Sequence, residues 1–489
     1  MKKLLIILLV ALTLMSISAV SAVDNQTQSD FVSLDEIDSE PVRANTTISA
    51  KPVTGYETFQ TEFTVNLTSD GEKLTGMPVK ITVNDVDYDK NTDDKGLVVL
   101  KLKLKEGSYI ASYSFAGNEN YSPSNGTAKI TVKAPAATVL KQADSNINYR
   151  QGSKTVFIVR LTKTYPAAVK YQNVTITVNG KTYKAQTDSK GYAQIFLNLK
   201  KGTYTVKYSF KGNSPYLASS GSCKIKVKES IPKGDGYWMW AGGMKTVNLK
   251  TLKAKGTKHI FLNSYAIDLY GRSAVQSWIA KANKQGIKVH IWMQVFYDGK
   301  WVRPVNKDGS LKYDYMNKKI SKAKYYSKIK GVAGVHFDYL RFGGTAHYYD
   351  TSTKAINYFA KKASVEIRKS KPNCIISAAI MPEPTMMEYY YGQDVPTMSK
   401  YLDVIIPMVY KGNYAKNTAW IKSVTSTFVK QSNGAQIWTG LQAYKSDSNV
   451  KKLSHSELLK DAKAAKAGGA KGVVLFRIGV TNLLNFKAV

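Results

Sequence analysis

Two carboxyl residues in the C-terminal half each follow a short apolar segment that has the alternation of a β-strand. In the segment 332–338, alternation places Asp338 on the face opposite the apolar side chains that must pack. Glu383 follows the next such segment, 375–381, with the same parity. Paired carboxyl groups can cleave a glycosidic bond, because one protonates the leaving oxygen while the other attacks or activates water. We therefore expect Asp338 to act as nucleophile or base and Glu383 as general acid.

Each of these carboxyl groups also has a purely structural interpretation. Arg341 is close enough in sequence to pair with Asp338 and to fix the following loop, and such pairs are common structural devices. Pro382 interrupts the alternation just before Glu383, so Glu383 could instead be an exposed loop residue. The sequence leaves both alternatives open.

Aromatic and amide side chains are concentrated near the ends of the same apolar segments. Aromatic rings stack on the apolar faces of sugars, while amides and hydroxyls fix the ring hydroxyls. Each aromatic residue taken alone is more often a core residue. The residues expected to line a sugar site are Trp238, Trp240, Tyr265, Trp292, Gln294, Arg341, Tyr410, Gln442 and Arg477.

Metal chemistry has weaker support in the sequence. His290 and His336 could lie near Asp338, but neither belongs to a His-Glu-x-x-His or comparable spacing. A Gly-x-Ser-x-Gly nucleophile motif is also lacking. We therefore expect no metal and no cofactor.

The elements that must position these residues alternate between strands and helices. The expected strands are 236–241, 259–263, 288–295, 332–338, 375–381, 404–410, 436–441 and 472–477, and helical patterns between them include 274–285, 352–370 and 454–467. Eight such strands predict an α/β TIM (β/α)8 barrel over 236–489, after a linker at 230–235. A doubly wound sheet is the alternative, but the first strand lacks the Gly-rich loop usual there. In a barrel, chemistry belongs at the C-terminal ends of the strands.

The region before the barrel contains two copies of one module, related by an offset of 95 residues. Ile81-Thr82-Val83-Asn84 recurs as Ile176-Thr177-Val178-Asn179. Both copies show the two-residue period of half-buried strands, separated by turn signals. The pattern predicts two all-β sandwiches, over 45–134 and 135–229.

The N-terminus and the net charge predict an exported protein with an anionic partner. Residues 1–22 have the charged start, the apolar run and the small residues of a signal peptide, with an uncleaved anchor as the alternative. Residues 23–44 are acidic and Ser-containing, which predicts a disordered leader. After cleavage we expect a secreted or cell-surface protein with no stable membrane span. The net charge of +35 favours polyanions. Because the chain is expected to be exported and no nucleic-acid-binding signature is present, we expect an acidic wall polymer rather than nucleic acid. The alternative is that the charge maintains solubility and has no particular partner. The two cysteines, Cys223 and Cys374, are expected to be buried free thiols rather than a disulfide.

Two resemblances extend this interpretation. The Gly-x-Tyr and Tyr-Ser-Phe-x-Gly-Asn segments of the modules resemble the immunoglobulin-like repeats of adhesin-like surface proteins of methanogenic archaea, which implies a stalk or an adhesive role. The segment Phe337-Asp338-Tyr339-Leu340-Arg341-Phe342 resembles the Asp-Tyr-x-Arg-Phe-Pro signature of a family of proposed barrel glycoside hydrolases, and 407–410 is similar to the Met-x-Tyr of family 18 chitinases. Both likenesses imply active-site roles for Asp338 and Tyr410.

The chain departs from both patterns. Gly343 stands where the first signature has Pro, and Lys411 stands where the chitinases carry Asp. The chitinase run Asp-x-x-Asp-x-Asp-x-Glu is missing as well, which argues against substrate-assisted chemistry.

The sequence thus predicts a secreted or surface glycoside hydrolase that acts on a cell-wall or other extracellular polysaccharide. The resemblance to methanogen surface proteins implies pseudomurein or another acidic wall polymer as the substrate. A barrel that binds glycan as an adhesin without cleaving it is the first alternative. A deacetylase or other metal-dependent hydrolase is the second.

Overall fold

The computed structural model describes residues 42–164 and 167–489, in two compact units. The first unit holds most of the chain up to Thr131, and the second holds the rest together with Gly55–Gln60 and Lys103–Glu106. The expected signal peptide and nearly all of the expected leader lie outside the described residues. Among the helices that are described, none has the length and apolar character needed to cross a membrane.

The first module is built from two antiparallel sheets. One contains β1 (Thr46–Ala50), β3 (Thr61–Ser69), β4 (Glu72–Lys73) and β7 (Leu97–Leu102), and the other contains β2 (Val53–Tyr56), β5 (Pro78–Val83), β6 (Val86–Asn91), β8 (Gly107–Phe115) and β9 (Ser124–Lys133). Alternate residues of β3, including Phe63, Val65 and Leu67, are fully buried. Burial of every second side chain is what the two-residue period predicts.

The second module repeats this arrangement. Its sheets contain β10 (Thr138–Gln142), β11 (Thr155–Lys163) and β14 (Tyr192–Leu197) in one, and β12 (Asn173–Val178), β13 (Lys181–Gln186), β15 (Gly202–Phe210) and β16 (Ser219–Val227) in the other. Strands β12, β13, β14 and β15 begin and end 95 residues after β5, β6, β7 and β8. At the β12–β13 hairpin, Asn179 and Gly180 both have positive φ, as the two-residue turn requires. The predicted duplication of a β-module is confirmed.

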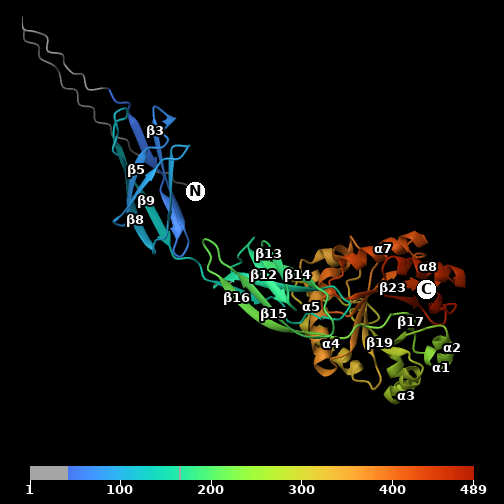
Figure 1. Cartoon of the computed structure of the whole chain (residues 1–489). Coiled ribbons are helices and arrows are strands. Elements are labelled where there is room, and N and C mark those ends of the chain that lie inside the picture. The colour runs from blue at the N-terminus through green and yellow to red at the C-terminus, as the bar shows by residue number, and fades with distance from the viewer. Residues whose placement is uncertain (1–41, 165–166) are drawn as a thin grey trace, which may run out of the picture. The chain divides into compact units, whose positions relative to one another are not determined.

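Residues 236–476 form a closed barrel of eight parallel strands (Figure 1). The strands are β17 (Gly236–Met239), β18 (His259–Asn263), β19 (Lys288–Gln294), β20 (Gly334–Asp338), β21 (Ile375–Ile380), β22 (Val404–Val409), β23 (Gln436–Gln442) and β26 (Gly472–Phe476). The predicted eight-stranded parallel barrel is confirmed, and each predicted strand end lies within two residues of the observed one.

Helices and short elements occupy the connections between the barrel strands. The helices are α1 (Gly243–Thr246), α2 (Leu249–Ala254), α3 (Tyr265–Lys284), α4 (Tyr313–Ser327), α5 (Ser352–Ser370), α6 (Val395–Met398), α7 (Thr418–Gln431) and α8 (His455–Ala467). The short elements are η1 (Ala346–Tyr348), η2 (Met387–Tyr391), η3 (Phe486–Ala488) and the hairpin of β24 (Tyr444–Ser446) and β25 (Asn449–Lys452). Ser454 caps α8 in a capping box with Glu457, so the helix begins where the Ser-x-x-Glu pattern predicts.

The barrel interior is filled by large side chains. Trp238, Phe261, Trp292 and Trp438 form an inner cluster with aliphatic residues of the other strands. A second and larger apolar layer lies between the strands and the helices. Because the interior is packed, only side chains near the C-terminal strand ends remain available for chemistry.

The second module contacts the barrel around the carboxylate of Asp403, which directly precedes β22. This buried carboxylate accepts hydrogen bonds from Arg150 Nε at 2.5 Å and Asn148 Nδ2 at 2.6 Å, both in the module. Arg368 Nη2 of the barrel donates at 2.9 Å. Burial opposes ionisation, but the charges of Arg368 and Arg150 outweigh it and hold the pKa of Asp403 well below its usual value.

Both cysteines are free thiols, as predicted. Cys374 is buried, as predicted, whereas the prediction of burial is wrong for Cys223, which is only partly buried in β16.

Candidate active site

Asp338 is the last residue of β20, at the C-terminal end of the barrel. Its Oδ2 accepts a hydrogen bond from Trp292 Nε1 at 3.0 Å, and its Oδ1 accepts one from the backbone N–H of Tyr339 at 2.8 Å. Tyr339 has a positive φ of 52°, an uncommon conformation for this residue. Burial raises the pKa of Asp338, although both donors and Arg341 oppose the rise. Asp338 as a whole residue is partly buried.

Arg341 lies beside Asp338 inside an aromatic cage. Its guanidinium is 4.6 Å from the ring centroid of Trp301, 5.4 Å from Tyr391 and 5.6 Å from Tyr339. Contacts of this kind hold a cation by its attraction to the ring faces. No salt bridge joins Arg341 to Asp338 among the residues that the structure describes, and Nη1 donates to the carbonyl of Phe342 instead. The Asp–Arg loop lock considered from the sequence is therefore not formed as a direct ion pair.

Glu383 lies in the loop after β21, where two tyrosines hold one of its oxygens. Tyr414 Oη donates to Oε1 at 2.8 Å and Tyr391 Oη donates to it at 3.2 Å. The other oxygen, Oε2, is buried and has no hydrogen-bond partner within the described part of the chain. Glu383 is thus a positioned, partly buried side chain rather than an exposed loop residue. Arg341 contacts the ring of Tyr391, so it connects the surroundings of Glu383 and Asp338.

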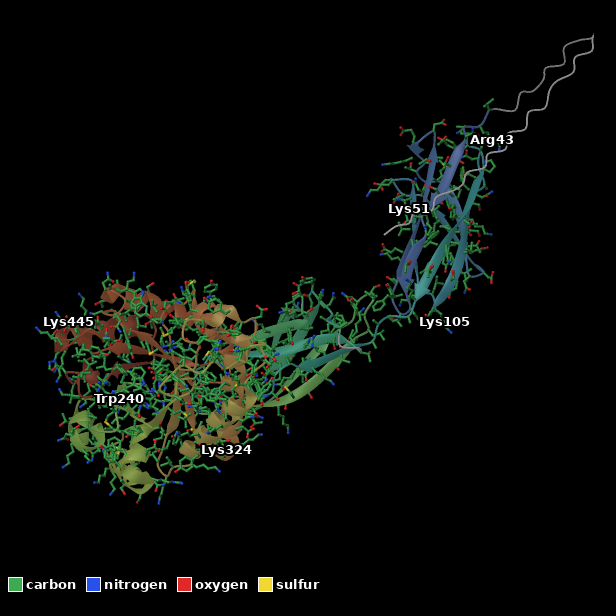
Figure 2. The ribbon with its side chains drawn as sticks, turned by 180° about the vertical axis from the view of Figure 1, so that it is seen from behind. Arg43, Lys51, Lys105, Trp240, Lys324 and Lys445 are labelled. Carbon is green, nitrogen blue, oxygen red and sulfur yellow. The ribbon has the colours of Figure 1, made fainter. Side chains whose placement is uncertain are left out.

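Aromatic side chains line the area beside Asp338. Trp240 lies 4.8 Å from Trp292, measured between ring centroids, and it is 39% exposed at the barrel surface (Figure 2). The guanidinium of Arg477 stands 5.5 Å from the Trp240 ring. Tyr410 packs 5.7 Å from Phe476, and burial, with a contribution from Asp338, raises its pKa well above the usual value. Trp240, Arg477 and Tyr410 are therefore placed together near Asp338.

Other side chains expected to contact sugar have different positions. Trp238 is 2% exposed and donates from Nε1 to His336 inside the barrel, which leaves its ring no free face. Gln442 is buried and links loops by donating to Asn413. Tyr265 and Gln294 line a separate small cavity beside Asp298 and Lys319.

The histidines are packed in the barrel interior. His336 accepts from Trp238 at Nε2 and its Nδ1 bonds to the hydroxyl of Ser377, so both ring nitrogens are engaged. His290 bonds to His259 through Nε2 at 2.9 Å. Burial lowers the pKa of His336 and of His259 to about 3. These are uncharged core imidazoles, and no cluster of three potential metal ligands occurs in the described ranges.

A cavity of about 350 Å³ is lined in part by Trp301, the indole whose ring Arg341 contacts. Its lining consists of Trp301, Val302, Arg303, Phe342, Gly343, Thr345, Tyr348 and Tyr349. A Cβ placed on Gly343 would lie 2.7 Å from the Trp301 ring, so the indole can occupy this position only because residue 343 is glycine. The departure from the Pro of the resembling signature thus has a structural counterpart. Trp301, Tyr391 and Tyr414 were not predicted as site residues, because loop residues have no periodicity that assigns them a face.

A comparison with protein families finds one matching model, and it covers part of the barrel. Residues 270–437 match a family model described as "Putative glycosyl hydrolase domain", a stretch that includes Asp338, Glu383 and Tyr410. No curated protein matches the chain.

Two chitinases and a spore cortex-lytic enzyme are among the similar solved structures. A chitinase of family GH18 from Cycas revoluta has 9% identity and a TM-score of 0.39, covering 50% of this chain and 95% of that chain. The Bacillus cereus spore cortex-lytic enzyme SleL has 10% identity and a TM-score of 0.38, covering 54% of this chain and 76% of that chain. Catalytic domain 2 of an Ostrinia furnacalis Group II chitinase has 11% identity and a TM-score of 0.37, covering 50% and 89%. Likeness at this level transfers no residue roles.

Proposed function

We propose that the barrel is a glycoside hydrolase that cleaves a cell-wall or other extracellular polysaccharide, with Asp338 and Glu383 as its catalytic carboxyl groups. The observation that carries the proposal is the contrast between these two groups. Asp338 has both oxygens held by N–H donors, whereas Glu383 has one oxygen held by two hydroxyls and the other without a partner.

Asp338 serves as the nucleophile or base. Donors from Trp292 and the Tyr339 backbone favour its ionised form and fix its orientation, while burial keeps it more basic than an ordinary Asp. A carboxylate that is ionised, oriented and weakly hydrated suits attack on the anomeric carbon or activation of water. Arg341, held by its aromatic cage, adds a fixed positive charge beside the reacting centre.

Glu383 serves as the general acid. A buried carboxyl oxygen without a donor is best satisfied when it carries the proton itself and donates to an acceptor. The glycosidic oxygen of a bound substrate would be that acceptor. The hydroxyls of Tyr391 and Tyr414 hold Oε1, which leaves Oε2 as the oxygen that can transfer the proton.

The rest of the chain fits an extracellular role. The signal-peptide pattern of residues 1–22 supports export, and the two β-modules support a stalk of immunoglobulin-like domains. The net charge of +35 favours an acidic polymer, for which pseudomurein or another acidic wall glycan is the proposed substrate. Trp240, Trp301 and Tyr410 would supply the stacking surfaces.

Release of reducing ends from wall polysaccharide preparations tests this function. We expect cleavage by the wild type and by the control Asp350→Asn, in which an exposed carboxyl group is changed. Asp338→Asn and Glu383→Gln should each lower the rate by about 10²-fold or more. If all four proteins bind glycan equally and none cleaves it, the barrel is an adhesin. If a chelator abolishes cleavage, a metal-dependent hydrolase replaces the proposal.

A further inference from the structure

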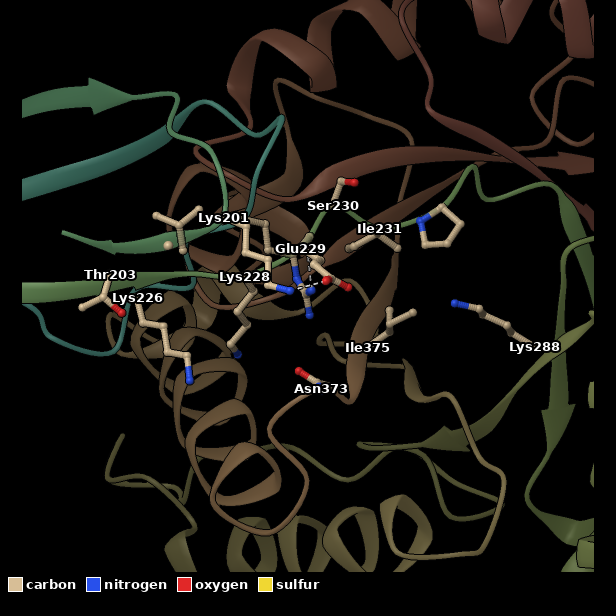
Figure 3. Close-up of a pocket in the computed structure, with 14 residues that line it drawn as sticks. Lys201, Thr203, Lys226, Lys228, Glu229, Ser230, Ile231, Lys288, Asn373 and Ile375 are labelled. Carbon is tan, nitrogen blue, oxygen red and sulfur yellow. Dashed lines mark hydrogen bonds and ion pairs between the residues drawn. The ribbon is translucent and has the colours of Figure 1, made fainter. Parts of the chain in front are cut away.

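A cavity of about 470 Å³ lies between the second module and the barrel, away from the proposed active site (Figure 3). The module contributes residues of β15, of β16 and of the segment that follows them. The barrel contributes Lys288, the first residue of β19, and Ile375, the first residue of β21. Asp338 ends β20, so the cavity is at the opposite end of the strands from the carboxyl groups.

Basic side chains dominate the cavity lining. Arg150, Lys201, Lys226, Lys228 and Lys288 supply five positive charges, and Glu229 is the one acidic side chain among the lining residues. Glu229 is already paired with Lys201. Neither Lys226 nor Lys288 has a carboxylate partner in the described ranges. Figure 3 shows Lys228 and Lys288 on opposite sides of the space near Ile375.

Two of the basic side chains that line the cavity, Lys228 and Arg150, are partly or largely buried. Lys228 is partly buried and donates to the carbonyl of Pro372 at 3.1 Å. Burial, with the nearby Arg368 and Arg150, lowers the pKa of Lys228 to about 8, although Asp403 opposes this. Arg150 is 8% exposed, and its Nη2 is buried without a hydrogen-bond partner. The carboxylate of Asp403 therefore forms ion pairs with the two guanidinium groups of Arg150 and Arg368, and it also lies near the ammonium group of Lys228.

We propose that this cavity binds an oxyanion, either a free phosphate or sulfate ion or the same group carried on a sugar. Four lysines and an arginine line the cavity with one paired carboxylate, and an anion would supply the missing negative charge. The volume is in the range of small-ligand sites and leaves room for more than the anion itself. A bound anion would contact the module and the barrel together, so it would also strengthen their association.

Calorimetric titration of the full chain with inorganic phosphate tests the proposal, with chloride at equal ionic strength as the blank. The test variant is Lys226→Ala/Lys288→Ala, which removes one exposed lysine from each side of the cavity. The matched control is Lys184→Ala/Lys253→Ala, which removes one exposed lysine from the module and one from the barrel elsewhere. We expect phosphate affinity to fall about tenfold or more in the test variant and to be unchanged in the control.

Thermal unfolding gives a second measurement that requires no catalysis. All seven tryptophans lie between residues 238 and 438, so tryptophan fluorescence reports the barrel. Saturating phosphate should raise the wild-type Tm by about 5 °C, and this rise should vanish in the test variant. Comparison of glucose 6-phosphate with glucose and phosphate shows whether the anion is preferred on a sugar. Equal phosphate binding by the test and control variants, or an equal effect of chloride, would overturn the proposal and leave the proposed hydrolysis unaffected.

Discussion

Replacement of Asp403 by Asn should destabilise the barrel more than any other single loss of a carboxylate charge described above. Its carboxylate accepts hydrogen bonds from Arg150, Arg368, Asn148 and the backbone N–H of Ile376. The substitution keeps the shape of the side chain but removes the negative charge. Two guanidinium groups are then left buried without compensation, since Arg150 Nη2 and Arg368 Nε already lack partners in the described structure.

The magnitude follows from the burial of the group. Breaking a buried ion pair by removing one partner costs about 3–5 kcal/mol, against a typical domain stability of about 5–15 kcal/mol. We expect about 3 kcal/mol, the low end, because the Asn amide oxygen can still accept one of the hydrogen bonds. Arg150→Met should cost less, since Asp403 keeps its partner Arg368.

Urea unfolding followed by tryptophan fluorescence is the appropriate assay, because the fluorescence reports the barrel. The midpoint should fall by roughly 1 M for Asp403→Asn and stay unchanged for the control Asp350→Asn. The folded-state pKa of Asp403 is depressed, so its contribution is present above the unfolded pKa of about 3.9 and is lost as the pH falls through the folded value. The difference between wild type and variant should therefore narrow below about pH 4. An unchanged midpoint at neutral pH would refute the assignment of Asp403 as the charge that holds both guanidinium groups.

Three further predictions concern the proposed active site. Trp292→Phe removes a hydrogen bond that lowers the pKa of Asp338, so the acidic limb of the pH–rate profile should move to higher pH by about one unit. An unchanged acidic limb would show that Asp338 is not the group whose ionisation controls the rate. Gly343→Ala should displace Trp301 and raise KM for polysaccharide about tenfold with little change in kcat, while an unchanged KM would show that this cavity is not a sugar subsite. Arg477→Met should raise KM for acidic glycans more than for neutral ones, and equal effects would contradict a charge-based role.

The sequence predicted the fold well where periodicity was strong. The duplicated module was visible as aligned positions such as Ile81 and Ile176, and its strands repeat at the same spacing. The eight apolar segments of the barrel region had lengths and separations that allow few other arrangements. Strand parity also indicated which side chains share a face of β20.

Strand periodicity predicts which face of the sheet a side chain is on, but not how far along the barrel axis it lies. This explains the different positions of Trp238 and Trp240. The two residues have the same parity, yet Trp238 lies within β17 and packs inside the barrel, while Trp240 lies beyond the strand end and is 39% exposed. The residues that complete the site, Trp301, Tyr391 and Tyr414, come from loops and a short π-helix. No sequence pattern places such residues next to a particular strand end. The pairing of Arg150 with Asp403, across 253 residues, likewise has no local signal.

The two ends of the barrel use the same residue type for opposite purposes, and the difference lies in the donors. Asp338 and Asp403 are each surrounded by protein, yet the pKa of Asp338 is raised while that of Asp403 is lowered. Asp403 faces two guanidinium groups that stabilise its charge so strongly that it gains little from a proton or an electrophile. Asp338 is held mainly by neutral N–H donors, which orient the carboxylate but lower its basicity less than a guanidinium group would. A carboxylate paired like Asp403 stabilises the fold, whereas a carboxylate held like Asp338 keeps the basicity that a reaction needs. Asp338 also lies at the C-terminal strand ends, where parallel barrels carry their chemistry.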